Sequence, residues 1–183
     1  MAFKDTTLTF SENKIVESDF GMEVMMDWEA PIMEKSAEYI CESKGDILEI
    51  GFGMGICSDY IQAQDVKSHT IIEIHPQVLE QANEWADGKS DVLIIEGDWS
   101  SLDINIKYDG IFLDTFGDEN WNSFKSFATS RAMSGAKVTY WNSKASENNE
   151  HDFDSIGFEE VSVSPDSNEY FSSNTYYMPK VVL

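Results

Sequence analysis

The sequence predicts an α/β protein built around a mainly parallel β-sheet, and two observations lead to this fold class. Up to residue 142, short apolar runs alternate with helix-like segments, an order in which neighbouring strands pair in parallel through right-handed crossovers. The last part of the chain instead holds two β-rich runs around the turn cluster Pro165 to Asn168, as in an antiparallel hairpin. With 183 residues, the chain has the length of a single domain.

The predicted elements follow from the spacing of apolar residues and from the positions of glycine, proline and polar clusters. Loose alternation over residues 6–16 predicts a hairpin, so segment 1–22 is expected to be an N-terminal hairpin or lid on a core of residues 23–183. Apolar residues at helical spacing predict helices over residues 24–41, 56–63, 76–86 and 120–130. Short β-rich runs predict seven strands over residues 46–50, 69–74, 92–95, 108–114, 136–141, 158–163 and 175–182, and the polar stretch 143–154 is expected to be an irregular connection.

Composition and charge limit the partners of the chain. Acidic side chains outnumber basic ones by 34 to 12, which gives a formal charge of −22. Nucleic acid and anionic membranes are disfavoured because binding them requires a basic surface, whereas a small cation would be attracted. The charge could equally serve solubility alone.

Other features of the composition indicate where the chain works. No apolar run approaches the roughly 20 residues that cross a bilayer, and the first residues lack a cationic segment followed by an apolar one. The two cysteines, Cys41 and Cys57, indicate neither a disulfide framework nor a structural metal. We therefore expect a soluble cytoplasmic protein.

The strongest local signal is the run ILEIGFGMGI, in which a strand opens into alternating glycines ahead of a helix. Gly51 and Gly53 let the backbone approach a ligand without collisions from a β-carbon, and the helix presents free N–H groups. A dinucleotide fingerprint would place its third glycine at position 56, which is Ile56, whereas here it is Gly55. This GxGxG spacing resembles motif I of class I S-adenosylmethionine methyltransferases.

The ends of the next two strands fit an adenosine. Glu73 lies about 20 residues after the first glycine, where a carboxylate can accept hydrogen bonds from both ribose hydroxyls. In the run EGDW, Asp98 could accept from an adenine amino group and Trp99 could cover a ring. His75 could touch the ribose or be a loop histidine with ordinary partners. The order of these features predicts an adenosyl cofactor, and the resemblance of the glycine loop to motif I implies S-adenosyl-L-methionine.

Two further carboxylates could select the substrate. On a helix over residues 24–41, Glu29 would share an apolar stripe with Met25 and Met33, where a lone carboxylate would need a cation or several donors. Alternatively, Pro31 could open the helix and leave Glu29 exposed in its first turn. Asp114 ends the apolar strand YDGIFLDTF at the sheet edge where ligands collect. A planar guanidinium could donate paired hydrogen bonds to both carboxylates.

The segments VMMDWEAPIM, LEIGFGMGI, IIEIHP, EGDW and YDGIFLDTF are similar to those of guanidinoacetate N-methyltransferase and its relatives that methylate the δ-nitrogen of arginine. The resemblance runs from about residue 24 to residue 141. It implies a Rossmann-like class I methyltransferase with a mainly parallel seven-stranded sheet and a C-terminal antiparallel hairpin. Relatives in this family are often dimers, so the resemblance is compatible with a monomer or a homodimer.

The resemblance also assigns roles to residues of this chain. Glu29 and Asp114 would bind the guanidino group, with Asp114 as the proton acceptor. Asn142, Ser143 and Lys144 occupy the position where the family grips the carboxylate end of the substrate. The residues that would surround the cofactor are Met25, Met33, Gly51, Phe52, Gly53, Met54, Gly55, Ile56, Glu73, Ile74, His75, Gly97, Asp98 and Trp99.

Three functions remain open from the sequence. The first is an N-methyltransferase for a small cationic guanidino compound, guanidinoacetate-like or arginine-like. The second is a methyltransferase for another amine or for an arginine in a peptide, and the third is a non-catalytic cofactor-binding module. No catalytic histidine or metal is expected in any of them. Phe3 and Phe10 are candidate lid residues that could instead belong to the core.

Overall fold

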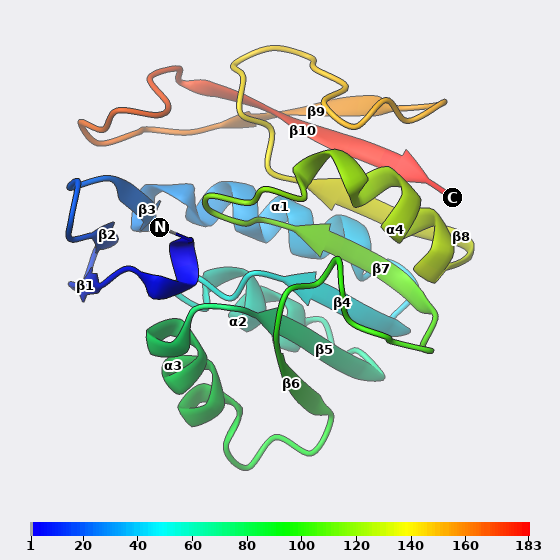
Figure 1. The fold of residues 1–183 in the computed structure, drawn as a ribbon. Helices are drawn as coiled ribbons and strands as arrows, with labels where there is room; N and C mark the ends of the chain where they lie inside the picture. Colours follow the sequence, from blue (N-terminus) through cyan, green and yellow to red (C-terminus); the bar gives the residue numbers. More distant parts are fainter. Residues whose placement is uncertain (1) are drawn as a thin grey trace.

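A computed structural model describes residues 2–183 of the chain, and Met1, which belongs to the predicted N-terminal segment, lies outside the described residues. A seven-stranded sheet in the order β6-β5-β4-β7-β8-β10-β9 forms its centre (Figure 1). Its strands are β4 (Asp46–Ile50), β5 (Ser68–Glu73), β6 (Val92–Glu96), β7 (Tyr108–Leu113), β8 (Ala132–Tyr140), β9 (Gly157–Ser162) and β10 (Thr175–Val182).

The pairing of the strands confirms the predicted fold class. β4 to β8 pair in parallel with their neighbours, whereas β10 runs antiparallel to both β8 and β9. The strand order reverses beside β4, which lies between β5 and β7. Ligands of open α/β sheets bind beyond the carboxyl ends of the strands at such a reversal. The fold therefore directs attention to the residues that follow β4, β5, β6 and β7.

Helices cover both faces of the sheet (Figure 1). They are α1 (Ala30–Ile40), α2 (Ile56–Ala63), α3 (Pro76–Ala86) and α4 (Phe124–Arg131). α1 and α2 pack on each other and, through side chains such as Ile32 and Ile61, on the face that carries Ile47 and Phe112. α4 packs through Phe124 on the opposite face. Since alternate residues of a strand point to opposite faces, β4 and β7 are apolar on both.

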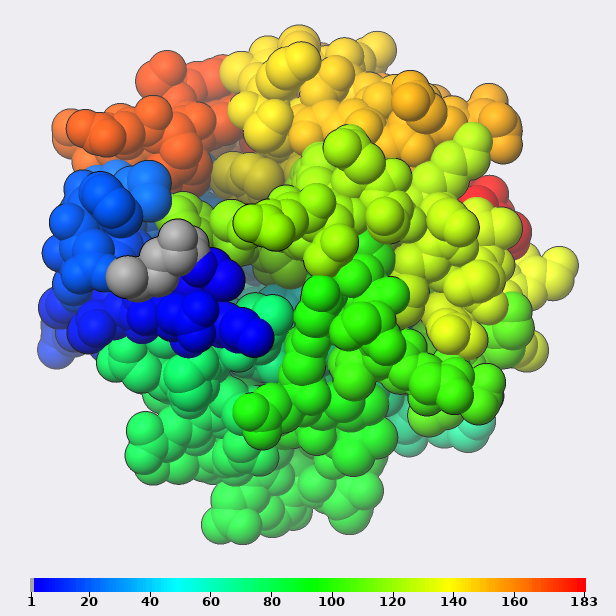
Figure 2. All heavy atoms as spheres, in the orientation of Figure 1, coloured from blue at the N-terminus to red at the C-terminus, as the bar shows by residue number. Residues whose placement is uncertain are grey.

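The N-terminal hairpin is present and is extended by a third strand. β1 (Leu8–Phe10) and β2 (Lys14–Glu17) pair antiparallel, and β2 also pairs with β3 (Glu23–Met26). A short 3-10 turn, η1 (Phe3–Asp5), precedes them. In the space-filling view, this blue N-terminal segment lies against α3 and against the loop that follows β7 (Figure 2).

The predicted helix over residues 24–41 is wrong in its first part. Residues 23–26 form β3, because Met25 pairs with Ile15 of β2. A 3-10 turn, η2 (Asp27–Glu29), follows, and α1 begins at Ala30 with Pro31 in its first turn. Proline is favoured in the first turn of a helix because the N–H that it lacks would have no partner within the helix.

The other predicted elements agree with the structure to within a few residues. The predicted helix over 120–130 is divided into the 3-10 turn η3 (Trp121–Ser123) and α4. The connection 143–154 contains no helix or strand, as predicted. Within residues 2–183, no helix is long and apolar enough to span a membrane.

Candidate functional site

The glycine loop after β4 needs glycine for steric reasons. Gly51, Gly53 and Gly55 all have positive φ angles, of 91°, 55° and 75°. A β-carbon on Gly51 would lie 1.9 Å from the carbonyl oxygen of Asp114, and one on Gly53 would lie 2.4 Å from Sδ of Met25. The loop therefore lies in direct contact with both β3 and the end of β7. Gly55 then caps the N-terminus of α2.

Glu73 ends β5 with its carboxylate held by backbone N–H groups. Phe52 donates to Oε2 at 3.0 Å, and Ile74 and His75 donate to Oε1 at 2.8 and 2.7 Å. The side chain is 5% exposed, and burial raises the pKa of its carboxyl group while the three N–H groups oppose that rise. Oε1 accepts two of these bonds and Oε2 accepts one, so the carboxylate is fixed in place and Oε2 can still accept a hydrogen bond from a hydroxyl.

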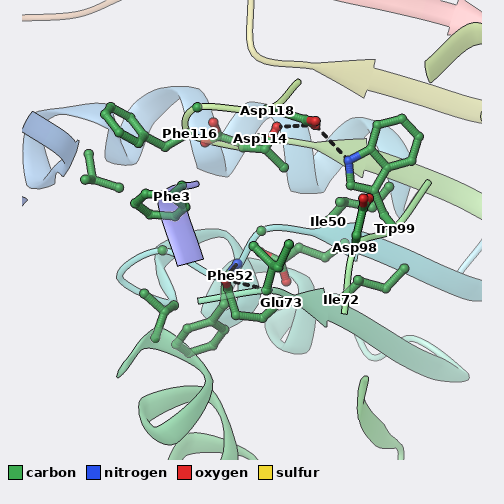
Figure 3. A pocket seen from close by; sticks show the side chains of 18 of the residues that line it. Phe3, Ile50, Phe52, Ile72, Glu73, Asp98, Trp99, Asp114, Phe116 and Asp118 are labelled. Atoms are coloured by element: carbon green, nitrogen blue, oxygen red, sulfur yellow. Dashed lines mark hydrogen bonds between the residues drawn. The ribbon is translucent and has the colours of Figure 1, made fainter. Parts of the chain in front are cut away.

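The loop after β6 is tied to the loop after β7. The indole N–H of Trp99 donates to Asp118 at 2.7 Å, and the side-chain amide of Asn120 donates to Asp98 at 3.0 Å. Trp99 is buried against Phe124 of α4. These contacts hold the Asp98 carboxylate and the Trp99 ring at one side of a common cavity (Figure 3).

This cavity has a volume of about 320 Å³ and lies beyond the carboxyl ends of β4 to β7. Figure 3 shows Glu73 and Phe52 on one side of it and Asp114 on the other. Of the residues predicted to bind the cofactor, those that line the wall are Met25, Met33, Gly51, Phe52, Gly53, Glu73, Ile74, Gly97, Asp98 and Trp99. Met54, Gly55, Ile56 and His75 are sequence neighbours of these residues that do not line the wall.

The N-terminal segment covers part of the cavity. Phe3 of η1 lines it and lies between two rings, at centroid distances of 4.9 Å from His75 and 5.1 Å from Phe116. The Nε2 atom of His75 is within 3.1 Å of the carbonyl oxygen of Thr6, which ties the segment to the end of β5. Phe3 and Phe10 both pack against the hydrophobic cluster that contains Leu8 and Ile15. Of the two, Phe3 also lines the cavity and Phe10 does not.

Glu29 is buried at the end of the turn between β3 and α1, with 3% of its surface exposed. Its Oε1 atom accepts hydrogen bonds from the backbone N–H of Met26 and from the hydroxyl of Tyr170, both at 2.7 Å. Pro31 does open the helix, but Glu29 is not exposed. The residue thus combines parts of both expectations: it precedes the helix and is nevertheless buried. It does not itself line the cavity.

Asp114 immediately follows β7 and lines the cavity. Its backbone N–H donates to the carbonyl oxygen of Ile50 at 2.9 Å, which fixes it beside the glycine loop. Burial raises the pKa of its carboxyl group, and the charge of Glu49 raises it further. Burial also raises the pKa of Glu29, to which the charge of Asp114 adds, while the hydrogen bonds from Tyr170 and Met26 oppose the rise.

These two carboxyl groups lack a basic partner. None of the ion pairs formed by residues 2–183 includes Glu29 or Asp114. A third acid, Glu49, is 1% exposed and lines the same cavity. Its Oε2 atom bonds Ser58 and His69, but its Oε1 atom has no partner. Because buried charges are costly unless they are paired, this arrangement suits cationic ligands.

The three residues predicted to hold the far end of the substrate lie outside the cavity wall. The side-chain amide of Asn142 donates to the carbonyl oxygens of Ser146 and Tyr177 within the protein. Ser143 and Lys144 are exposed, and Ser143 bonds Glu150. Among the described residues, Lys4 is the one lysine or arginine that lines the cavity.

Sequence reasoning missed several residues of the site. Lys4 precedes the segments that carry the family pattern, and Asp118 and Asn120 lie in a loop without a periodic signal. Tyr170 lies between β9 and β10, far from Glu29 in the sequence. Only the aromatic character of the stretch EYF could have drawn attention to it. None of these contacts follows from spacing along the chain.

The parallel sheet, the glycine loop after β4, the carboxylate at the end of β5 and the acidic loop after β6 together define a class I S-adenosylmethionine-dependent methyltransferase. A family model described as guanidinoacetate N-methyltransferase matches residues 1–156. The chain belongs to the guanidinoacetate N-methyltransferase family.

Curated relatives agree with this family. The chain is 38% identical over 125 residues to protein arginine N-methyltransferase 2 of Kluyveromyces lactis. This alignment covers 62% of the chain and 30% of that protein. It is 34% identical over 139 residues to the protein of the same name from Aspergillus oryzae, which covers 72% of this chain and 33% of that protein. The chain thus spans about a third of the length of these relatives.

Solved structures share the fold. The N-methyltransferase NodS from Bradyrhizobium japonicum, in complex with S-adenosyl-l-homocysteine, aligns with a TM-score of 0.66 and 12% identity, covering 85% of this chain and 87% of that one. Spermidine synthase from Thermotoga maritima aligns with a TM-score of 0.69 and 10% identity, covering 96% of this chain and 72% of that one. At these identities, the likeness concerns the fold alone.

Proposed function

We propose that this chain transfers a methyl group from S-adenosylmethionine to a nitrogen of a small guanidino compound, guanidinoacetate-like or arginine-like. The observation that carries the proposal is the pair Glu29 and Asp114, two acids beside the cofactor cavity that form no ion pair within residues 2–183. A guanidinium is planar and always charged, and its N–H donors match carboxylate geometry. The net charge of −22 also favours a cationic substrate over nucleic acid or an anionic membrane.

The cavity residues suit the proposed cofactor. Glu73 is held by three N–H groups and keeps one acceptor position, on Oε2, for a ribose hydroxyl, and Asp98 with Trp99 suits an adenine. The unpartnered Oε1 atom of Glu49 suits an ammonium group. A β-carbon on Gly51 would collide with the carbonyl oxygen of Asp114, so glycine allows the loop to lie close to the end of β7. When bound, the cofactor supplies an electrophilic methyl group.

In this reaction, the residues of the chain would bind, orient and deprotonate the acceptor. Glu29 and Asp114 hold the guanidinium and turn one nitrogen toward the cavity, so that positioning supplies much of the rate. A free guanidinium is a poor nucleophile because its pKa exceeds about 12 and its lone pairs are delocalised. As the new N–C bond formed, the S–C bond of the sulfonium would break with its electron pair passing to sulfur, and the nitrogen would lose a proton to the carboxylate of Asp114.

The surroundings of this pair would exclude water. Trp28 is buried beside Glu29, and Met25 and Met33 line the cavity. Phe3 covers part of the opening, so we propose that the N-terminal segment acts as a lid. Contacts between charges strengthen when water is removed, because the local dielectric constant falls.

A second candidate is methylation of an arginine within a protein. It is favoured by the printed name of the curated relatives, protein arginine N-methyltransferase 2. The acceptor group is the same, so Glu29 and Asp114 would serve it equally. The two functions differ in what is attached to the guanidino group.

A mass-spectrometric screen with isotopically labelled S-adenosylmethionine tests the proposal. The acceptors are guanidinoacetate, L-arginine, an arginine-containing peptide and amines without a guanidino group. We expect a labelled methyl group on a small guanidino compound. Label on the peptide alone would support the second candidate, and label on other amines alone would contradict both. Calorimetric binding of the cofactor without transfer to any acceptor would indicate a non-catalytic module.

A further inference from the structure

The loop between β9 and β10 reaches Glu29 through one side chain. The hydroxyl of Tyr170 donates a 2.7 Å hydrogen bond to Oε1 of Glu29, and the backbone N–H of Met26 donates to the same oxygen. Both of these donors use Oε1, so Oε2 is the oxygen left for a ligand. Tyr170 lies beyond residues 1–156, the part of the chain that the family model matches.

The ring of Tyr170 belongs to an aromatic wall formed by Trp28, Trp141, Tyr170 and Phe171. Trp28 stacks with Tyr170 and Phe171 at centroid distances of 5.8 Å, with interplanar angles of 30° and 20°. Trp141 meets Tyr170 edge-on at 6.1 Å. These four rings come from three separate parts of the chain.

The wall lies beside both carboxylates. Trp28 immediately precedes Glu29, and Trp141 follows β8, whose end is bonded to the end of β7: the N–H of Trp141 donates to Leu113, the neighbour of Asp114, at 2.9 Å. Flat aromatic faces attract guanidinium groups by stacking and by cation–π interaction. A guanidinium bound to the two acids would therefore have an aromatic surface at hand.

We propose that Tyr170 is a positioning and specificity-determining residue of the acceptor site. Its hydroxyl fixes Glu29 through Oε1 so that Oε2 faces the acceptor, and its ring completes the aromatic wall that favours a planar cation over an alkyl ammonium. This inference rests on the proposed function and deepens it. It assigns part of the acceptor site to the C-terminal hairpin.

The charged and titratable groups around Glu29 make the proposal measurable. Burial raises the pKa of Glu29 and the charge of Asp114 at the end of β7 adds to this, whereas the hydrogen bond from Tyr170 lowers it. Burial also raises the pKa of Tyr170 and of Tyr176 on β10; the charges of Glu29 and Asp114 add to both, and that of Glu23 on β3 adds to Tyr170. The phenol therefore stays neutral and able to donate. Removing it raises the pKa of Glu29, because the carboxylate loses a donor.

The experiment compares Tyr170→Phe with the wild-type chain and with Tyr177→Phe. Tyr177 is a matched control because, within residues 2–183, its hydroxyl forms no hydrogen bond. For Tyr170→Phe, we expect kcat/KM for the best guanidino acceptor to fall about tenfold, mainly through KM, since a hydrogen bond to a charged group is lost. The acid limb of the kcat/KM profile should move to higher pH. S-adenosylmethionine affinity, measured by calorimetry, should remain within twofold.

Tyr170→Leu, which removes the ring as well, should raise KM further. It should also lower the ratio of kcat/KM for guanidino acceptors to kcat/KM for alkyl-amine acceptors. If Tyr170→Phe matches Tyr177→Phe in KM and pH profile while the wild type methylates a guanidino compound, the role of Tyr170 is refuted and the proposed function stands. Equal losses of cofactor affinity and acceptor affinity would also refute it, because they indicate a structural role alone. A wild-type chain that methylates no guanidino compound refutes both proposals.

Discussion

The carbonyl oxygen of Asp114 lies 1.9 Å from the point where a β-carbon on Gly51 would stand. The glycine loop after β4 and Asp114 after β7 are therefore in direct backbone contact. A change on either side of this contact must displace the other.

Gly51→Ala should weaken folding and cofactor binding together. The new β-carbon meets backbone at a positive φ, so we expect the free energy of unfolding to fall by about 2–4 kcal/mol and the cofactor affinity to fall at least about tenfold. Gly88→Ala is the matched control, because Gly88 also has a positive φ but has nothing within 4 Å of the added atom. Gly88→Ala should lower the free energy of unfolding by about 1–2 kcal/mol and leave the cofactor affinity unchanged. Urea unfolding and calorimetry measure both, and equal effects of the two variants would contradict the steric argument.

Glu73→Gln should reduce cofactor affinity. The amide offers one acceptor oxygen where the carboxylate offers two, so one of the three N–H groups that hold Glu73 faces an NH₂ group. We expect a loss of about 1.5–3 kcal/mol in the binding free energy of S-adenosylhomocysteine. The same change at the exposed Glu80 provides the control. Unchanged affinity in Glu73→Gln would exclude the ribose role.

Asp114→Asn should abolish most of the methyl transfer while leaving the cofactor bound. The amide has the shape of the carboxylate but cannot accept the proton, so kcat should fall by about 10²–10⁴. Single-turnover mass spectrometry measures the rate, and calorimetry checks that the cofactor still binds. Asp103→Asn, at an exposed position, should behave as the wild type. Near-normal transfer in Asp114→Asn would remove Asp114 from the proposed chemistry.

The acid pair should make the ligand-free protein less stable as the pH rises. Because the folded-state pKa values of Glu29 and Asp114 are raised, the folded state holds more protons than the unfolded chain at intermediate pH. Their contribution is fully present below the unfolded carboxyl pKa of about 4 and is lost as the pH rises through the raised values. We expect Tm to fall from about pH 5 into the neutral range, and Glu29→Gln to flatten this fall. Glu34→Gln, at an exposed position, should leave the fall of Tm with pH unchanged.

His151 should have the opposite effect, so that its contribution to folding stability increases as the pH rises. It is 5% exposed among Trp121, Tyr140 and other rings, its ring nitrogens form no hydrogen bond within residues 2–183, and burial lowers its pKa to about 4. The unfolded chain therefore binds the proton more readily, so stability present above the unfolded pKa is lost as the pH falls toward 4. The Tm of the wild type minus the Tm of His151→Phe should increase as the pH rises from 4 to 7. A constant difference would contradict this prediction.

Much of the cofactor site was predictable because local rules determine it. Residues 46–50, 56–63, 76–86 and 175–182 form the predicted elements with the predicted bounds. The carboxyl ends of parallel strands meet at one edge, so Gly51, Glu73, Asp98 and Asp114 had to lie close together once the sheet was recognised. The pattern predicted a glycine turn that lets a ligand approach the backbone, whereas the contact of Gly51 with Asp114 became apparent only in the fold.

The acceptor side was less predictable because long-range contacts form it. Helical spacing grouped Met25, Glu29 and Met33, but β3 and a 3-10 turn replace the first turns of that helix because Met25 pairs with Ile15. Glu29 is buried by Tyr170, and no rule of spacing links residues 141 positions apart. Asn142 turns inward because Ser146 and Tyr177 supply its partners. Such choices depend on packing that forms only in the complete fold.

The placement of the tryptophans makes the protein an optical reporter of its own ligands. Trp99 lines the cofactor cavity, whereas Trp28 and Trp141 belong to the aromatic wall beside the two acids. A ligand in the cofactor cavity would alter the fluorescence of Trp99, and a guanidino ligand beside the two acids would alter that of Trp28 and Trp141. Replacing Trp99 by phenylalanine, or Trp28 and Trp141 together, would separate the two signals, so the order in which the ligands bind could be followed without an attached dye.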